Sequence, residues 1–203
     1  MYLPKHFEQT DQALALEVMR AHNFAVMVSN DDAGVPYATH LPVVVAERDG
    51  AIVIEGHVAK PNPHWRYLQA RPEVLVMFQG PHAYMSPGVY PDLARVPTWT
   101  YIAVHAYGTA TLIEDEAGKD GFLKRLIGLH EPAYADQWRS LEPDFQSKML
   151  SGITAFSIAV TKLQPKFKLN QHRPVAHAKM KEIYAAGTPD EQALAQWMTR
   201  LGM

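Results

Sequence analysis

The stretch that decides the fold is Ile54–Pro87, with the sequence IEGHVAKPNPHWRYLQARPEVLVMFQGPHAYMSP. Its β-rich start must end at the turn Ala59–Pro63, because two prolines remove backbone donors and disfavour helical geometry in the residues before them. Asn62 is suited to cap a helix, with the proline after it at the first helical position, so we expect about two helical turns over His64–Ala70. Val74–Phe78 is then long enough for a second strand and too short for a helix.

The same turn offers a binding chemistry. A helix that begins directly after a strand carries unpaired backbone N–H groups, and His57 and Lys60 lie beside this one. Such a position favours an anion, for example a phosphate group. The alternative interpretation is purely structural, with Lys60 solvated and Asn62 acting only as a cap. The pattern alone leaves both interpretations open.

Composition limits the class of protein. A chain of 203 residues and 22.7 kDa is one domain or a domain with an appendage. A net charge of −2 argues against binding nucleic acid by bulk electrostatics. The absence of cysteine excludes disulfides, thiolate metal sites and cysteine catalysis. No apolar run approaches the roughly 18–20 residues of a membrane span, and the N-terminus lacks a signal-peptide core, so we expect a cytoplasmic protein that does not enter a membrane.

The rest of the chain indicates antiparallel strands with helices around them. We expect strands over residues 24–29, 35–46, 51–57, 98–113 and 153–161, and helices over residues 11–22, 114–129, 175–186 and 190–201. Pro42 interrupts the second strand, which implies an edge position or a bulge. Residues 80–96 are rich in proline and predict a long loop. Strands linked by hairpins favour a mostly antiparallel barrel with external helices over a doubly wound parallel sheet.

Common catalytic and metal motifs are absent. The ten histidines invite a metal hypothesis, but His130-Glu131 lacks the second histidine of the zinc-binding helical pattern. The sequence has no glycine-rich dinucleotide loop and no phosphate-binding P-loop. Its serines lack the context of a nucleophile elbow. We therefore assign no catalytic residue and no metal ligand.

Two further segments are candidates for binding. The stretch Tyr37–Pro42 places a threonine and a histidine before a proline break, where free backbone groups would meet a planar heterocycle; the alternative is an ordinary half-solvated strand. Residues 162–173 are the most basic part of the chain, and they would bind nucleic acid, an anionic ligand or only water. The two helices that follow have the outline of a helix-turn-helix, but Asp190 and Glu191 would face the phosphates and disfavour direct reading of DNA.

Seven colinear motifs together resemble the PaiB family. They are MYLPKHFE at 1–8, ATHLP at 38–42, GHVAKPNPHW at 56–65, FQGPHAYMSP at 78–87, VPTWTYIAVHAYG at 96–108, LHEP at 129–132 and KFKLNQHR at 166–173. Members of this family are FMN-binding proteins of the split-barrel fold, commonly described as negative transcriptional regulators. The resemblance covers nearly the whole chain.

The resemblance implies a mainly β, α+β fold with peripheral helices: a six-stranded antiparallel split barrel of Greek-key type. It implies a homodimer that binds FMN in the groove between subunits. Residues 1–173 would form the FMN-binding domain, and residues 174–203 a C-terminal helical appendage.

The resemblance also implies site residues. The strand with Thr39, His40 and Leu41 would make backbone contacts to the isoalloxazine ring. The ribityl phosphate would be held by His57, Val58, Lys60 and Asn62. The neighbours of the ring or ribityl chain would be Gln79 and His82 from one subunit and Trp99 or Tyr101 from the other. The basic segment would add Lys166, Lys168, Gln171 and Arg173.

Three functions are compatible with this resemblance. The first is an FMN-binding regulator that affects transcription by binding DNA directly or through another regulator. The second is an FMN-dependent oxidoreductase whose small anionic substrate lies against the basic segment beside the ring. The third is haem binding or breakdown, with His82, His105 and His172 as candidate iron ligands.

Overall fold

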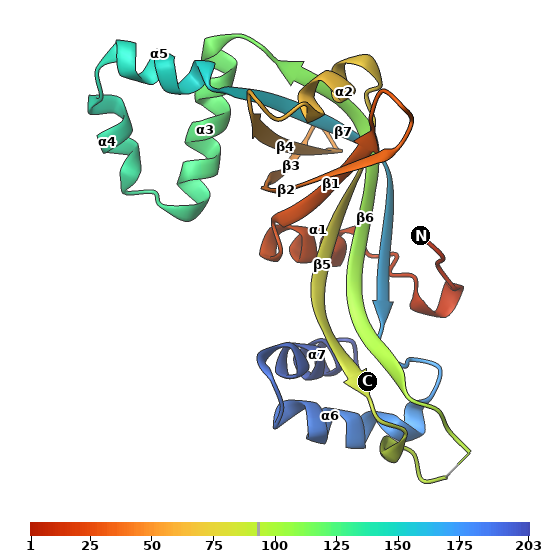
Figure 1. Ribbon diagram of the computed structural model, residues 1–203. Helices are drawn as coiled ribbons and strands as arrows, with labels where there is room; N and C mark the ends of the chain where they lie inside the picture. The colour runs from red at the N-terminus through yellow and green to blue at the C-terminus, as the bar shows by residue number, and fades with distance from the viewer. Residues whose placement is uncertain (93) are drawn as a thin grey trace. The chain divides into compact units, whose positions relative to one another are not determined.

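The computed structural model describes residues 1–92 and 94–203 and shows an α+β protein built on one β-sheet (Figure 1). The sheet has seven strands in the order β2-β1-β5-β6-β7-β4-β3. The strands are β1 (Phe24–Asn30), β2 (Pro36–Pro42), β3 (Val44–Arg48), β4 (Ala51–Ala59), β5 (Glu73–Met85), β6 (Thr98–Ile113) and β7 (Ile153–Lys168). The helices are α1 (Gln12–Ala21), α2 (His64–Ala70), α3 (Glu116–His130), α4 (Tyr134–Ser140), α5 (Pro143–Ser151), α6 (His177–Ala185) and α7 (Pro189–Arg200).

The mainly β, α+β class is confirmed, but the predicted closed sheet of six strands is wrong. The extra strand arises where the predicted strand 35–46 divides into β2 and β3. Pro42 has no N–H with which to continue the ladder, and the N–H of Val43 instead bonds to the carbonyl of Asn23 at 2.9 Å. Before this break β2 pairs with β1, and after it β3 pairs with β4. The two pieces therefore lie at opposite ends of an open strand order.

Two strands run well past their predicted ends. β5 runs on to Met85, so the first six residues of the predicted loop 80–96 are strand. β7 extends to Lys168, so much of the basic segment belongs to a strand. The predicted bounds of α2 and β6 are those observed.

Contacts divide the chain into two compact units. Unit 1 contains Met1–Ala21, Gln79–Val104 and Gln164–Met203, and unit 2 contains His22–Phe78 and His105–Leu163. The long strands β5, β6 and β7 contribute residues to both units.

Unit 2 buries one face of its strands in a close-packed core. Ile54 and Phe156 are completely buried there. Gly108 lies against β7 so closely that a Cβ atom would come within 2.3 Å of the carbonyl oxygen of Ala159. Helix α3 packs its buried Phe122 and Leu126 in a second cluster with Val44 and Ala155. The core thus depends on backbone contact at β6 and β7 as well as on side-chain burial.

A buried carboxylate ties α3 to β4. Glu55 is 2% exposed, and its two oxygens accept bonds from the guanidinium of Arg125 at 2.9 Å each. Arg48 adds a third bond at 2.8 Å. A buried charge is tolerated only when it is paired and hydrogen-bonded, as this one is.

Unit 1 contains a helical hairpin at the C-terminus, made by α6 and α7 (Figure 1). The sequence Gly187-Thr188-Pro189 suits a helix start, with Thr188 as the cap and Pro189 at the first helical position, and the structure confirms both. The Thr188 side chain accepts the N–H of Glu191, whose carboxylate accepts the N–H of Thr188 in return. The ring of Trp197 packs edge-on against Phe167 of β7, with 5.3 Å between centroids. In the described part of the chain, every helix falls short of the length and apolarity that crossing a membrane needs.

We predict that Gly108→Ala destabilises the protein by about 1–3 kcal/mol, because the added methyl group must displace the backbone of β7. Gly128→Ala in α3 is the matched control. Its Cβ would meet nothing within 4 Å, and alanine is favoured over glycine in a helix by up to about 1 kcal/mol. Urea unfolding should show the first variant below the wild type and the second at or above it; a Gly108→Ala protein of unchanged stability would contradict this packing.

Candidate functional site

A buried histidine organises the candidate site of unit 2. His64, the first residue of α2, is completely buried, with Nε2 2.9 Å from the hydroxyl of Ser29 and Nδ1 2.8 Å from that of Thr39. A neutral imidazole has one N–H, so one hydroxyl donates to the ring and the other accepts from it. Burial lowers the pKa of His64 to about 4, which keeps the ring neutral at physiological pH. The ring therefore fixes the start of α2 against β1 and β2.

The amide of Asn62 extends this network to the turn after β4. Its Nδ2 donates to Thr39 Oγ1, and its Oδ1 accepts from the hydroxyl of Tyr37, both at 3.3 Å. Its Oδ1 also accepts the N–H of His64 at 3.0 Å. We call this region, comprising β2, the turn at residues 60–63 and the start of α2, the β2–α2 corner. Its polar side chains are held by one another.

Most backbone amides beside the predicted anion site have partners within the chain, so few free N–H donors remain there. The N–H of Lys60 bonds to the carbonyl of Gly152 and that of Asn62 to the carbonyl of Ala59, each at 2.8 Å. The N–H of His64 is taken by Asn62, and the prolines have none. The cap residue of α2 is Pro63, not Asn62 as predicted. The turn satisfies its own donors because two prolines leave so few of them.

Two cations remain available at the corner. The ammonium of Lys60 lies 4.2 Å from the ring centroid of Trp65, and the guanidinium carbon of Arg66 lies 5.1 Å from it. Trp65 is itself anchored, since its Nε1 donates to the carbonyl of Lys60 at 3.0 Å. Within the described residues, neither cation forms an ion pair. Sequence reasoning missed Arg66, although a cation directly after an aromatic residue in HWR was a usable signal.

The other predicted residues of unit 2 have different surroundings. The side chains of Leu41 and Val58 belong to the core, since each residue is only 3% exposed, so neither side chain is available to a ligand. His40 is exposed on β2, which is the first strand in the order and so has an outer edge free of the described strands. His57 faces Phe122 at 5.6 Å between centroids, with its buried Nδ1 lacking a partner among the described residues. Burial lowers the pKa of His57 as well.

Four predicted residues lie in unit 1 on β5 and β6. Gln79 is exposed. His82 accepts the indole N–H of Trp99 at 3.3 Å, and its Nε2 lies 3.7 Å from a carboxylate oxygen of Asp190. The ring of Tyr101 lies under two ammonium groups, 5.3 Å from that of Lys166 and 5.8 Å from that of Lys168.

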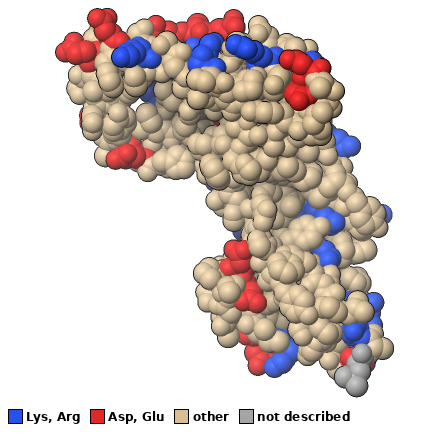
Figure 2. Space-filling model, viewed as in Figure 1, with Lys and Arg blue, Asp and Glu red and all other residues tan. Residues whose placement is uncertain are grey.

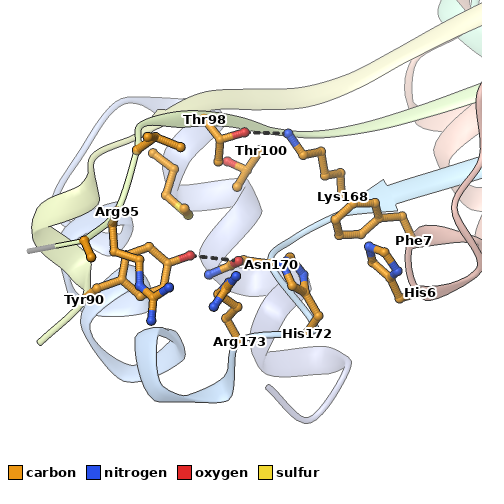
Figure 3. A pocket seen from close by; sticks show the side chains of 13 residues that line it. His6, Phe7, Tyr90, Arg95, Thr98, Thr100, Lys168, Asn170, His172 and Arg173 are labelled. Atoms are coloured by element: carbon orange, nitrogen blue, oxygen red, sulfur yellow. Dashed lines mark hydrogen bonds between the residues drawn. The ribbon is translucent and has the colours of Figure 1, made fainter. Parts of the chain in front are cut away.

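The predicted basic residues divide into two pairs. Lys166 is buried and donates to the carbonyl of Tyr2 at 3.0 Å, while Gln171, in the turn after β7, donates back to the carbonyl of Phe167 on that strand. These two side chains hold local structure. By contrast, Lys168 and Arg173 line a cavity within unit 1 (Figure 3). Sequence reasoning missed its other polar walls, including Tyr90, Arg95 and Asn170, because they are separated by up to 80 residues in the chain.

The three histidines proposed as haem ligands do not form one described group. His82 and His172 belong to unit 1, where His82 contacts Trp99 and His172 stacks near His6 and Phe7. His105 belongs to unit 2, and its buried Nδ1 has no partner among the described residues.

Comparison with solved structures defines the fold class. The chain is similar to the FAD and haem binding protein from Mycobacterium smegmatis, with a TM-score of 0.62 and 17% identity, covering 79% of this chain and 73% of that one. It is also similar to the flavocytochrome Anf3 from Azotobacter vinelandii, with a TM-score of 0.61 and 18% identity over 79% and 69% of the two chains. The protein therefore has the split-barrel type of fold, here with an open seven-stranded sheet.

Sequence comparison then gives the family. Residues 1–162 match the family described as "Putative FMN-binding domain", and the chain belongs to that family, whose cofactor is FMN. The chain is 39% identical over 176 residues to the "Protease synthase and sporulation protein PAI 2" of Bacillus subtilis, covering 85% of this chain and 83% of that protein. The resemblance to the PaiB family is thereby confirmed.

We predict that His64 makes the protein acid-sensitive. Its pKa is about 4 in the folded chain and near 6.5 in the unfolded chain, so the unfolded chain binds the proton first. The stability that the neutral ring confers is complete above pH 6.5 and is lost as the pH falls from 6.5 to 4, by roughly 3 kcal/mol.

Urea unfolding across this pH range measures the effect. His64→Gln should weaken the pH dependence even though it lowers stability at neutral pH, whereas His40→Gln, on the exposed face of β2, should leave it unchanged. If the free energy of unfolding falls with pH to the same extent in His64→Gln and in the wild type, His64 is not the source of the acid sensitivity.

Proposed function

We propose that this protein is an FMN-binding homodimer in which the β2–α2 corner of each chain receives the phosphate of the cofactor. The observation that carries the proposal is the pair of cations, Lys60 and Arg66, held on the faces of Trp65 without a carboxylate partner among the described residues. An arginine and a lysine together suit a phosphate, one as a planar fork and the other as a point charge. The family assignment of residues 1–162 supplies the identity of the ligand.

The residues at the β2–α2 corner would bind the phosphate through positively charged side chains and not through backbone N–H groups. Thr39 and Asn62 are engaged in the His64 network, so we assign them a supporting role: they hold β2 and the turn in register. His57 has a buried ring nitrogen without a partner in the described chain, which makes it the neutral donor or acceptor of the set.

The outer edge of β2 suits the flavin ring. Its inner edge pairs with β1 from Pro36 to Pro42, and its outer edge presents backbone groups to no described strand. A heterocycle with alternating donors and acceptors, such as the isoalloxazine ring, matches such an edge as a further strand would. We therefore propose that residues 39–41 contact the ring through their backbones, as the resemblance implies. When bound, FMN would supply redox chemistry that this chain's own side chains lack.

Two exposed aromatic side chains in unit 1 support the proposed homodimer. Tyr84 and Trp99 are 51% and 48% exposed and lie 6.3 Å apart between ring centroids on β5 and β6. Exposed aromatic pairs of this kind are typical of interaction surfaces. We propose that Gln79 and His82 of one subunit and Trp99 or Tyr101 of the other approach the flavin at this interface.

We propose a regulatory role in a cytoplasmic setting, exercised through a protein partner and not by direct reading of DNA. The relative from Bacillus subtilis is named for protease synthesis and sporulation, which favours a regulator over a dedicated enzyme. On the face drawn in Figure 2, Lys and Arg side chains are interspersed with Asp and Glu side chains. The net charge of −2 adds to this, since binding to the DNA backbone relies on cations. Steeply salt-dependent binding to a promoter fragment, absent with random DNA, would overturn the indirect role.

We predict that Lys60→Ala and Arg66→Ala each weaken FMN binding by roughly ten- to a hundredfold, the range that loss of one charge-assisted hydrogen bond gives. The control is Lys148→Ala, an exposed lysine of α5 in the same unit. Quenching of flavin fluorescence during titration measures the affinities. Equal affinities in Lys60→Ala, Arg66→Ala and the control would remove the phosphate from this corner.

We predict that native mass spectrometry detects a dimer carrying two FMN molecules. The visible spectrum should show flavin bands; a Soret band would instead support haem binding. A monomer that retains flavin would exclude a site shared between subunits.

A further inference from the structure

A cavity of about 380 Å³ lies within unit 1, between the ends of β6 and β7 and the N-terminal arm (Figure 3). Its volume is at the small end of the roughly 300–1,000 Å³ range of ligand pockets, so it suits a compact molecule. The described lining includes Lys168, Arg173 and Arg95 but no Asp or Glu. Its chemistry therefore favours an anion.

Two of these cations have no balancing charge among the residues that the structure describes. Arg95 is paired, since its guanidinium lies 2.8 Å from the carboxylate of Asp92. Lys168 donates to the neutral hydroxyl of Thr98 at 2.7 Å, and the side chain of Arg173 forms no ion pair with the described residues. Burial and the neighbouring Lys166 lower the pKa of Lys168, as expected for a cation that lacks an anion.

The backbone holds Arg173 in place. Two residues after the end of β7 the chain turns at a left-handed residue, Asn170, with φ of 68°, a conformation that asparagine tolerates better than most residues. The hydroxyl of Tyr90 donates to Asn170 Oδ1 at 3.1 Å (Figure 3). The backbone N–H of Arg173 donates to the carbonyl of Asn170 at 3.0 Å. The turn that carries the guanidinium is thus fixed without using the guanidinium itself.

The remaining walls are apolar and aromatic. Phe7, Met85 and Val96 line the cavity, and the ring of His172 lies 5.6 Å from that of Phe7 between centroids. Burial lowers the pKa of His172, and His6, Arg173 and Lys168 lower it further. At neutral pH this ring therefore belongs with the uncharged walls.

We propose that this cavity binds a small aromatic carboxylate, with the carboxylate paired to Lys168 and Arg173 and the ring against Phe7. A guanidinium binds a carboxylate through two parallel hydrogen bonds, which fixes its orientation. This site consists only of unit 1 residues and does not depend on the FMN assignment.

Isothermal titration calorimetry of the full chain with benzoate tests the proposal, and benzylamine is the matched probe of similar shape and opposite charge. Benzoate should bind and benzylamine should not. Arg173→Gln and Lys168→Met should each weaken benzoate binding roughly ten- to a hundredfold, while Arg173→Lys retains part of the affinity. Lys179→Gln, on the exposed face of α6 in the same unit, should have no effect.

The proposal is overturned if benzoate fails to bind the folded wild type, if benzylamine binds equally well, or if Arg173→Gln binds benzoate as the wild type does. A parallel FMN titration separates this site from the flavin site. Lys60→Ala should lose FMN affinity and keep benzoate affinity, and Arg173→Gln should do the reverse. If FMN displaces benzoate from the wild type and Arg173→Gln loses FMN affinity, the cavity is a flavin subsite and the proposal is refuted.

Discussion

The arrangement of the candidate flavin site depends on one buried neutral imidazole. His64 joins Ser29 of β1 to Thr39 of β2, and Asn62 carries the same network into the turn after β4. Protonation would place an uncompensated charge in a site with no exposed surface, which is why the pKa of this histidine is so low. The neutral ring therefore holds the β2–α2 corner in this arrangement. The corner in turn positions Lys60 and Arg66, which lie over Trp65.

Unit 2 uses its polar groups in two distinct ways. Hydroxyls, amides and backbone N–H groups are consumed in holding β2, the turn and α2 together. By contrast, Lys60 and Arg66 lie over the indole ring of Trp65 and form no ion pair with the residues that the structure describes. A cation on an aromatic face keeps its full charge and its N–H donors, so it remains able to bind an anion. The cavity of unit 1 follows the same rule, since Asn170 and Tyr90 fix the turn and Arg173 forms no ion pair within the described part of the chain.

The sequence predicted local structure better than side-chain function. Proline and capping chemistry act over a few residues; they correctly gave the bounds of α2 and the cap of α7, although the cap of α2 is Pro63 and not Asn62. Pro42 correctly marked a break, but the number of strands was wrong because Val43 redirects the chain through a bond to Asn23. The roles of Lys166 and Gln171 could not be read from the motif KFKLNQHR, since burial and local bonds decide which of its cations stay free. Tyr90 and Asn170 meet only in the folded chain.

The most direct test of the account is the electron density of a crystal loaded with FMN. The account predicts the phosphorus atom beside Lys60 and Arg66, with phosphate oxygens within about 4 Å of both cations, the limit for an ion pair, and the ring along the outer edge of β2. Density for the phosphate in the cavity of Lys168 and Arg173, with the β2–α2 corner empty of ligand, would contradict it.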